Sequence, residues 1–282
     1  MRKNLTIDRD DGTKIQAEYF VPEPGTANVK APLVIMAHSF PKNLSGKGEL
    51  FDELGEMISG MGVRAMTFEY SHSVNVSAED QKFDFNTAAK DFESILNWAA
   101  EKKHRRVAFI TEGLGAPIVF MNMPDNAMFT ILCWPAFDLQ QVKNELFKAP
   151  KYQDDLDRNG FLNVAGNIIS KELLDQLEHT DLTPYLDFAY SPTMALHGVK
   201  DTVFPIQHLD IAREKLMVPR FSITSFDDGE AGLKNPKHKS LCLHHIREFI
   251  DKHQYRDLSD EAKAEIKKSR LKLENTLRAK SE

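Results

Sequence analysis

A short apolar run followed by small residues contains the pattern best suited to carry chemistry in this chain. The run Val107-Ala-Phe-Ile110 is followed by the frame Thr111-Glu112-Gly113-Leu114-Gly115. A strand, a sharp turn and a helix with small residues two apart form the G-x-S-x-G frame, which raises a serine nucleophile above a parallel sheet. Here glycine occupies the position of that nucleophile. The pattern therefore predicts a nucleophile turn without its hydroxyl. An ordinary buried strand running into a helix is the alternative interpretation.

Alternating strand and helix patterns surround this segment. Apolar runs predict strands over 31–37, 63–70, 107–110, 128–136, 192–198 and 220–226, and Asp10-Asp11-Gly12 predicts a hairpin between strands at 5–8 and 14–21. Apolar stripes at helical spacing predict helices over 49–61, 84–103, 205–216 and 240–253. This order predicts an α/β fold, with a mostly parallel twisted sheet and helices on both of its faces.

Two segments depart from the alternation. Residues 139–190 are charged and mixed, with turn signals at Asn159-Gly160 and Ala165-Gly166-Asn167 and a short helix at 171–178. We interpret this insertion as a small lid over the ends of the strands within a domain of residues 1–254. Residues 255–282 predict a charged amphipathic helix with Ser259 as its N-cap. Its narrow apolar stripe consists of Leu258, Ala262, Ile266, Leu273 and Leu277. We expect this stripe alone to pack on the body, on a second copy or on a partner.

Composition narrows the classes of partner. The chain has 282 residues, a net charge of −6 and 41% hydrophobic residues. No basic block stands out before the C-terminal tail, so nucleic acid is not an expected partner. No apolar stretch has the length of a signal peptide core or a membrane span, which favours a cytoplasmic protein without a membrane partner. Cys133 and Cys242 lie in apolar segments and provide neither a disulfide framework nor zinc spacing, so no metal or cofactor is expected.

In its order of elements and motifs the chain resembles the α/β-hydrolase fold. Within that fold it is similar to small bacterial serine hydrolases of the feruloyl- or cinnamoyl-esterase and acyl-peptidase type. The resemblance covers about residues 5–253. It rests on the opening hairpin, the strand–turn–helix, the segment 160–173, His38-Ser39-Phe40-Pro41 and, most specifically, His197-Gly198-Val-Lys-Asp201-Thr-Val-Phe-Pro205.

The resemblance implies roles for particular residues. Asp201 matches the acid of the catalytic triad, whereas Gly113 stands in the place of the serine. The family histidine would fall on Gly232 or on Ala231, and neither residue can accept a proton. Two of three triad members are therefore missing, and an acyl-enzyme cannot form in the usual way. The amides of Leu114 and Phe40 are the expected oxyanion-hole donors, and they depend on the backbone alone.

Three side chains are candidate substitutes for the missing groups. Glu112 is a candidate base or binding carboxylate, although side chains at its position usually pack. His238 follows the histidine loop and could turn inward, although the same position is surface in the family. Ser39 faces the pocket mouth if the backbone there tolerates the loss of the usual glycine. No histidine pair has the spacing of a zinc-binding helix.

These residues predict a non-hydrolytic protein of the α/β-hydrolase fold, a pseudo-hydrolase. We expect it to bind a small acyl or carboxylate ligand above Gly113, where loss of the serine leaves room, or else a protein partner. The insertion would cover such a ligand with Phe161, Leu162, Ile168 and Ile169. The alternatives are a pocket filled by its own side chains, a scaffold acting through residues 258–280, and an ester hydrolase, acyl hydrolase or lyase with a rearranged site.

Overall fold

The computed structural model describes residues 1–40, 46, 49–71, 83–147, 150–164, 167–187, 189–216, 221–255 and 260–281. Some residues used in the sequence predictions lie outside these ranges: Pro41, Ala165, Gly166, Leu258 and Ser259.

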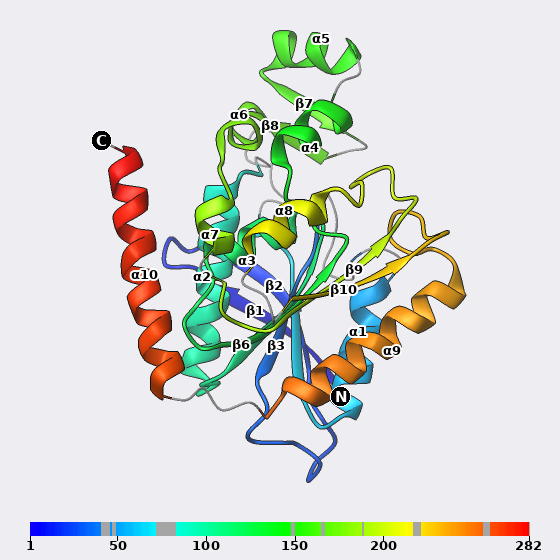
Figure 1. Ribbon diagram of the computed structural model, residues 1–282, viewed down its shortest axis with the longest axis vertical. Coiled ribbons are helices and arrows are strands. Elements are labelled where there is room, and N and C mark those ends of the chain that lie inside the picture. Colours follow the sequence, from blue (N-terminus) through cyan, green and yellow to red (C-terminus); the bar gives the residue numbers. More distant parts are fainter. Residues whose placement is uncertain are drawn as a thin grey trace.

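A mostly parallel sheet forms the centre of the molecule (Figure 1). Its strands are β1 (Arg2–Asp8), β2 (Lys14–Phe20), β3 (Leu33–Ala37), β4 (Arg64–Phe68), β5 (Val107–Glu112), β6 (Ala127–Cys133), β9 (Thr193–Gly198) and β10 (Phe221–Phe226). The strand order is β1-β2-β4-β3-β5-β6-β9-β10. Only the pairs β1–β2 and β2–β4 are antiparallel among these described strands. The predicted α/β class and mostly parallel sheet are confirmed.

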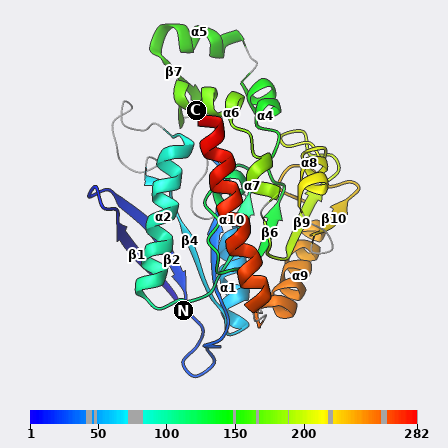
Figure 2. The same cartoon turned by 60° about the vertical axis from the view of Figure 1, so that its left-hand side comes forward.

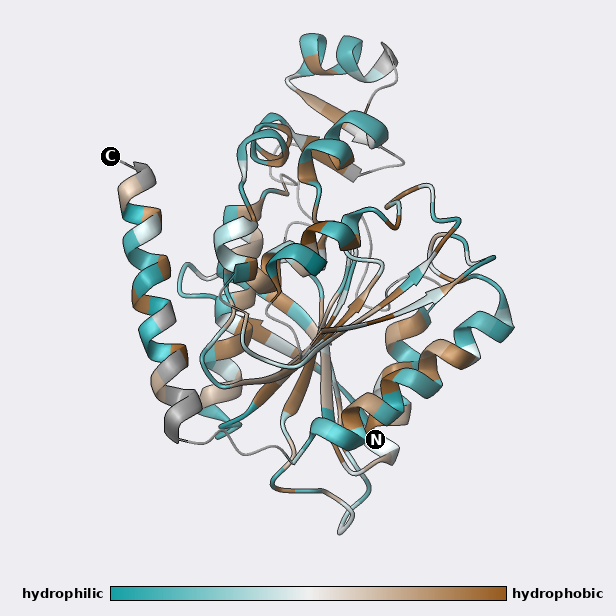
Figure 3. Cartoon of the chain, in the orientation of Figure 1, coloured by the Kyte–Doolittle hydropathy of each residue, from teal (hydrophilic) through white to brown (hydrophobic). Residues whose placement is uncertain are grey.

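Helices cover both faces of this sheet. The helices α1 (Leu50–Gly60) and α9 (Pro236–His253) lie on one face, and α2 (Phe85–Glu101) and α3 (Gly115–Met121) lie on the other (Figure 1). Helix α8 (His208–Lys215) lies near the carboxyl ends of the strands. The apolar residues of α1 and α2 are buried, among them Phe51, Leu54, Phe92 and Ile95, and Figure 3 shows the central strands largely in the brown of hydrophobic residues. Helix α2 begins after Asp84, whose carboxylate accepts a hydrogen bond from the backbone N–H of Thr87 at 2.9 Å.

The insertion stands beyond the carboxyl ends of the parallel strands, at the top of Figure 1. It consists of α4 (Leu139–Leu146), α5 (Pro150–Asn159), β7 (Phe161–Val164), β8 (Asn167–Ser170), α6 (Lys171–His179) and α7 (Thr183–Asp187). The sequence predicted the helix at 171–178 but not the antiparallel hairpin of β7 and β8. Leu162, Ile168 and Ile169 are buried, while Phe161 is half-buried. A role of the insertion as a lid stays a prediction.

The C-terminal helix α10 (Asp260–Ser281) lies outside the body, in front of it in Figure 2 and between α2 and α7. Its side chains Ile266, Leu273 and Leu277 are half-buried and face the body. Within the described ranges, no helix combines the length and the apolar character that crossing a membrane requires.

Parallel strands bring distant segments of the chain together at each end of the sheet. The carboxyl end collects the segments that follow β3, β5, β6, β9 and β10. The strand order reverses around β3, which lies between β4 and β5. In open α/β sheets, ligands bind in the crevice beyond the carboxyl ends at such a switch point. We therefore expect a ligand site, if the fold has one, in this crevice.

Candidate functional site

The turn between β5 and α3 has the geometry of a tight elbow. Gly113 adopts a φ of +49°, in the left-handed region that favours glycine. Its N–H donates to the carbonyl of Cys133 at 3.2 Å. Gly115 lies so close to β3 that an added Cβ would stand 2.3 Å from the carbonyl oxygen of Ala37. The predicted strand–turn–helix is thus present, and close packing of helix against strand requires the glycine at its second small position.

The space for a nucleophile side chain is already occupied. A Cβ on Gly113 would lie 2.5 Å from Ser39 Oγ and 2.7 Å from a ring carbon of Phe204. Ser39 is 3% exposed and Phe204 is 6% exposed. The expectation that loss of the serine leaves room above Gly113 is therefore wrong. The loops after β3 and β9 each place one side chain in that volume, because close packing favours filling a void.

The elbow amide is bonded to the protein's own hydroxyl. Leu114 N–H donates to Ser39 Oγ at 3.2 Å, and Ser39 Oγ donates weakly to the carbonyl of Phe40 at 3.4 Å. A donor that is satisfied internally is not free to polarise a substrate carbonyl. The Phe40 ring stacks on Phe83 with centroids 4.1 Å apart. Convergence of the Phe40 and Leu114 amides on one point stays a prediction.

Asp201 holds the loop that carries Phe204. Its Oδ1 accepts hydrogen bonds from the N–H groups of Val203 at 2.8 Å and Phe204 at 2.9 Å. His197 Nε2 donates to the carbonyl of Phe204 at 2.7 Å, and burial lowers the pKa of this imidazole. Asp201 Oδ2 is buried and has no hydrogen-bond partner among the described residues. The motif that resembles an acid loop thus positions an apolar ring in this chain. A triad-acid role for Asp201 stays a prediction.

The loop after β10 offers no histidine at the elbow. Gly232 adopts a φ of +75°, and the following Leu233 is also left-handed, with a φ of 46°. His238 does not lie in a mobile loop, because α9 begins at Pro236 rather than at the predicted Ser240. Its Nε2 lies 2.8 Å from the carboxylate of Asp228, and the Asp228 side chain is exposed. His238 therefore belongs to the first turn of a helix and is paired there.

Glu112 is buried beside an indole. Its Oε1 accepts a hydrogen bond from Trp134 Nε1 at 3.2 Å, and the residue is 1% exposed. Trp134 follows β6 with a φ of 39°, which is uncommon for a residue with a side chain. The structure therefore places Glu112 as a buried acceptor, and a role as base or binding carboxylate stays a prediction.

A cavity lies among the segments that follow β6 and β10 and the helices α1 and α9. It measures about 260 Å³ and is lined by Leu50, Trp134, Gly232, Leu233, Lys234, Lys239 and Cys242. We call it the lysine cavity. It contains the position where the family histidine was expected, between α1, α9 and the loop after β10. No sequence spacing pointed to it, because its lining comes from four separate segments.

Cys242 lines this cavity, and Cys133 is its neighbour. Both are buried free thiols, and Cys133 is hydrogen-bonded with Cys242. This hydrogen bond, together with burial, raises the pKa of the Cys133 thiol. A thiol whose pKa is raised in this way is a poor nucleophile. Among the described residues, no group of three or more His, Cys, Asp or Glu side chains is arranged to hold a metal ion.

His208 ties the insertion to the body, a contact that the sequence did not predict. Its Nδ1 accepts hydrogen bonds from the N–H groups of Phe137 and Asp138, both at 3.0 Å. Its Nε2 donates to Gln141 Oε1 at 2.7 Å. Burial lowers the pKa of His208 to about 4, so the ring is neutral near pH 7. This imidazole therefore acts as an acceptor for the turn that begins α4.

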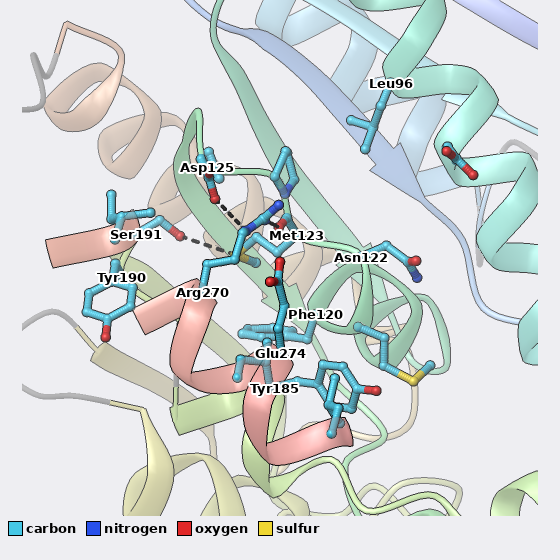
Figure 4. Close-up of a pocket in the computed structure, with 17 residues that line it drawn as sticks. Leu96, Phe120, Asn122, Met123, Asp125, Tyr185, Tyr190, Ser191, Arg270 and Glu274 are labelled. Carbon is cyan, nitrogen blue, oxygen red and sulfur yellow. Dashed lines mark hydrogen bonds and ion pairs between the residues drawn. The ribbon is translucent and has the colours of Figure 1, made fainter. Parts of the chain in front are cut away.

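A larger cavity separates α10 from the body (Figure 4). It measures about 510 Å³ and has Leu96, Phe120, Tyr185 and Tyr190 on the body side. Arg270 of α10 crosses it, with Nε 2.7 Å from Asp125 Oδ1 and a guanidinium nitrogen donating to the carbonyl of Met123 at 2.6 Å. A polar anchor therefore joins the apolar stripe in holding this helix, which the sequence expected the stripe to do alone.

Known structures resemble this chain over most of its length, although no family model and no curated protein sequence matches it. Est1E from Butyrivibrio proteoclasticus, in a structure with ferulic acid bound, aligns with a TM-score of 0.76 and 14% identity, covering 89% of this chain and 100% of that one. A putative hydrolase from Agrobacterium vitis S4 aligns with a TM-score of 0.70 and 18% identity, covering 89% and 98%. Mouse alpha/beta hydrolase domain-containing protein 10 aligns with a TM-score of 0.68 and 19% identity, covering 89% of this chain and 99% of that one. The chain therefore has the α/β-hydrolase fold.

Proposed function

We propose that this chain is a non-hydrolytic protein of the α/β-hydrolase fold that binds a small carboxylate or acyl compound in the lysine cavity. The observation that carries this proposal is the occupied elbow. Ser39 Oγ and the Phe204 ring fill the volume of a nucleophile, and the Leu114 amide is bonded to Ser39. Covalent acyl transfer needs a nucleophile with a base beside it, together with free oxyanion donors. The described geometry supplies neither.

The lining of the lysine cavity supports the ligand class. Leu50, Trp134 and Leu233 form apolar walls that suit a short hydrocarbon or aromatic body. Lys234 and Lys239 supply ammonium groups, and Lys239 also pairs with Glu53 of α1. Apolar walls with a few placed polar groups are typical of small-molecule sites. A volume of about 260 Å³ suits a compound smaller than most cofactors.

The runner-up is an ester or acyl hydrolase, or a lyase, that uses Ser39, Glu112 or His238. Each of these side chains has another partner in the structure. Ser39 Oγ bonds to two backbone groups, Glu112 accepts from Trp134, and His238 pairs with Asp228. Catalysis by any of them requires a rearrangement of the described contacts.

Two measurements on the full chain test the proposal. The first is turnover of p-nitrophenyl acetate and butyrate with fluorophosphonate labelling, where we expect no signal above the buffer background. The second is thermal stabilisation by short-chain and aromatic carboxylates, because a ligand that binds only the folded state raises Tm. Lys234→Gln should weaken that binding roughly ten-fold, which corresponds to about 1.4 kcal/mol. Lys171→Gln, on the exposed surface of α6, is the matched control.

Tryptophan fluorescence locates the bound carboxylate. The chain has two tryptophans, and Trp98→Phe leaves Trp134 of the lysine cavity as the only one. We expect carboxylates to change its emission saturably. Ester turnover or labelling that disappears in Ser39→Ala would overturn the non-hydrolytic proposal in favour of the rearranged enzyme. A lack of any carboxylate effect on Tm and on Trp134 would remove the ligand assignment.

A further inference from the structure

A third open site lies at the amino end of the sheet, opposite the elbow. This groove measures about 620 Å³ and is lined by β1, β2, the segment before β3, the start of β4, and the end of α2 with the loop that follows it. We call it the basic groove. Its cations are Lys3, Lys30, Arg64, Lys102, Lys103, Arg105 and Arg106, and the last four belong to the run Lys102-Lys103-His104-Arg105-Arg106. This run is a basic block ahead of the C-terminal tail, so the expectation that the chain has no such block is wrong.

Most of these cations have no counter-charge among the residues that the structure describes. No acidic residue is among the described residues that line the groove. Within the described ranges, no ion pair involves Lys3, Lys30, Arg64, Lys102, Lys103 or Arg105. Arg106 donates to the carbonyl of Lys30 at 3.3 Å. The chain as a whole carries a net charge of −6, so this concentration of positive charge is local. Like charges gathered around a groove repel one another, and a bound anion relieves that repulsion.

Aromatic side chains form a firm wall beneath the cations. Tyr19 Oη lies 3.2 Å from His104 Nε2, and the Tyr19 ring meets Trp98 edge-on at 5.5 Å. Trp98 and His104 stack with centroids 6.1 Å apart. Burial and the nearby Arg64 guanidinium lower the pKa of His104, which places the charge of Arg64 close to this wall. Low-dielectric walls strengthen the attraction between a groove of one charge and an opposite ion.

We propose that the basic groove binds a small anion with two or more linked phosphate groups, such as a nucleoside triphosphate or inorganic polyphosphate. Linked phosphates match cations that come from four segments of the chain, and guanidinium groups pair with phosphate oxygens in bidentate fashion. The volume is within the usual range for small-molecule sites. A single-stranded nucleic acid requires a track along the surface rather than one groove. A membrane surface favours a broad patch, whereas the exposed apolar residue on this rim is Val29 alone among the described lining.

The test uses the full chain with tripolyphosphate and ATP as probes in isothermal titration calorimetry. We expect saturable binding of both, weakened by added salt, and much weaker binding of orthophosphate. The variant Lys103→Gln/Arg105→Gln should bind tripolyphosphate at least ten-fold more weakly. Both residues are exposed, so this variant should fold normally. The matched control Lys171→Gln/Arg213→Gln removes the same charge from exposed residues of α6 and α8 and should bind like the wild type.

Site assignment again relies on the two tryptophans. Trp134→Phe leaves Trp98 of the basic groove, and we expect ATP and tripolyphosphate to change its emission. Equal weakening by the control variant would show a general charge effect and overturn the proposal. So would an absence of tripolyphosphate binding, including the case in which the protein binds a single-stranded oligonucleotide or phosphatidylserine vesicles instead. The carboxylate experiments report on Trp134, so failure of one proposal leaves the other standing.

Discussion

The two ends of the parallel sheet differ in whether their polar and charged side chains are buried or exposed. At the carboxyl end, Ser39, Leu114 and Asp201 are almost completely buried, and their polar groups bond mainly to the protein itself. At the amino end, Lys30, Lys103 and Arg105 are exposed around an open groove. Around Gly113 the carboxyl end is closely packed, whereas the amino end carries an open groove lined by cations. A fold therefore does not by itself identify the surface that carries function.

The difference follows from what each set of loops contains. The loops after β3 and β9 supply small and apolar side chains, and glycine at 113 leaves a volume that they fill. The loop before β5 supplies five basic or imidazole side chains in sequence, which cannot be buried without partners. Lys102, Lys103 and Arg105 are exposed, and His104 and Arg106 are half-buried beside the groove.

The variant Gly113→Ser tests the close packing of the carboxyl end most directly. The new side chain would overlap Ser39 Oγ and Phe204, on a backbone of φ +49°. Overpacking and left-handed strain together should lower the free energy of unfolding by about 3 kcal/mol. Urea denaturation measures this loss, and Ser39→Gly in the same chain should recover part of it. If Gly113→Ser unfolds at the same urea concentration as the wild type, the carboxyl end is less tightly packed than described.

A second prediction compares the pH response of the two ends. A histidine of ordinary pKa near 6.5 is protonated in the unfolded chain below that pH, whereas His208 stays neutral in the folded protein down to about 4. The contribution of His208 to the free energy of unfolding should be fully present above pH 6.5. It should fall by up to about 3 kcal/mol as the pH drops from 6.5 to 4. His208→Asn keeps an acceptor for the two amides but removes the titration.

Denaturation at several pH values between 4 and 7 measures this slope. The slope should be shallower in His208→Asn. His197 also has a pKa lowered by burial and will leave a remaining slope. His104→Gln, at the amino end, should change the slope less because that imidazole is only half-buried. An unchanged slope in His208→Asn would contradict the buried neutral imidazole.

The third prediction concerns restored catalysis. Gly113→Ser with Ala231→His should stay at background ester turnover, because Ser39 and Phe204 still occupy the site. Adding Ser39→Gly and Phe204→Ala opens it, and turnover should rise by roughly ten-fold or more in a strongly non-additive way. Ala231 is the better position for histidine, because Gly232 is left-handed. Melting curves establish that each variant is folded. A folded quadruple variant without turnover would mean that the oxyanion donors do not converge.

The smallest effect is expected from α10, which belongs to neither end. Arg270→Ala removes an exposed ion pair with Asp125 and one hydrogen bond, and should cost under about 1 kcal/mol. Deletion of residues 257–282 should leave the body folded and lower Tm by only a few degrees. It would also uncover Leu96, Phe120 and Tyr185, so size-exclusion chromatography should show self-association. A strictly monomeric, fully soluble deletion variant would show that α10 covers nothing of consequence.

The sequence by itself determined the class and order of the fold. Continuous apolar runs predicted the buried strands, stripes at helical spacing predicted α1 and α2, and Asp10-Asp11-Gly12 predicted the first hairpin. These signals are local, since a backbone segment shows its preferred period within one element. The elbow was also predictable, because a strand followed by Gly113 and Gly115 requires a tight turn. Boundaries were less certain, and α9 begins four residues before its prediction because Asn235 caps it and Pro236 suits the first turn.

Only the tertiary structure decided what each end of the sheet contains. Ser39 Oγ reaches the Leu114 amide, Phe204 fills the nucleophile position, and Cys133 meets Cys242. The basic groove combines Lys3, Arg64 and the 102–106 loop from segments far apart in the chain. Such contacts depend on strand order and on which side chain fills a given volume, and neither is encoded in local spacing. An empty nucleophile position can be read from the sequence, but whether that space stays open is settled by the residues that pack into it.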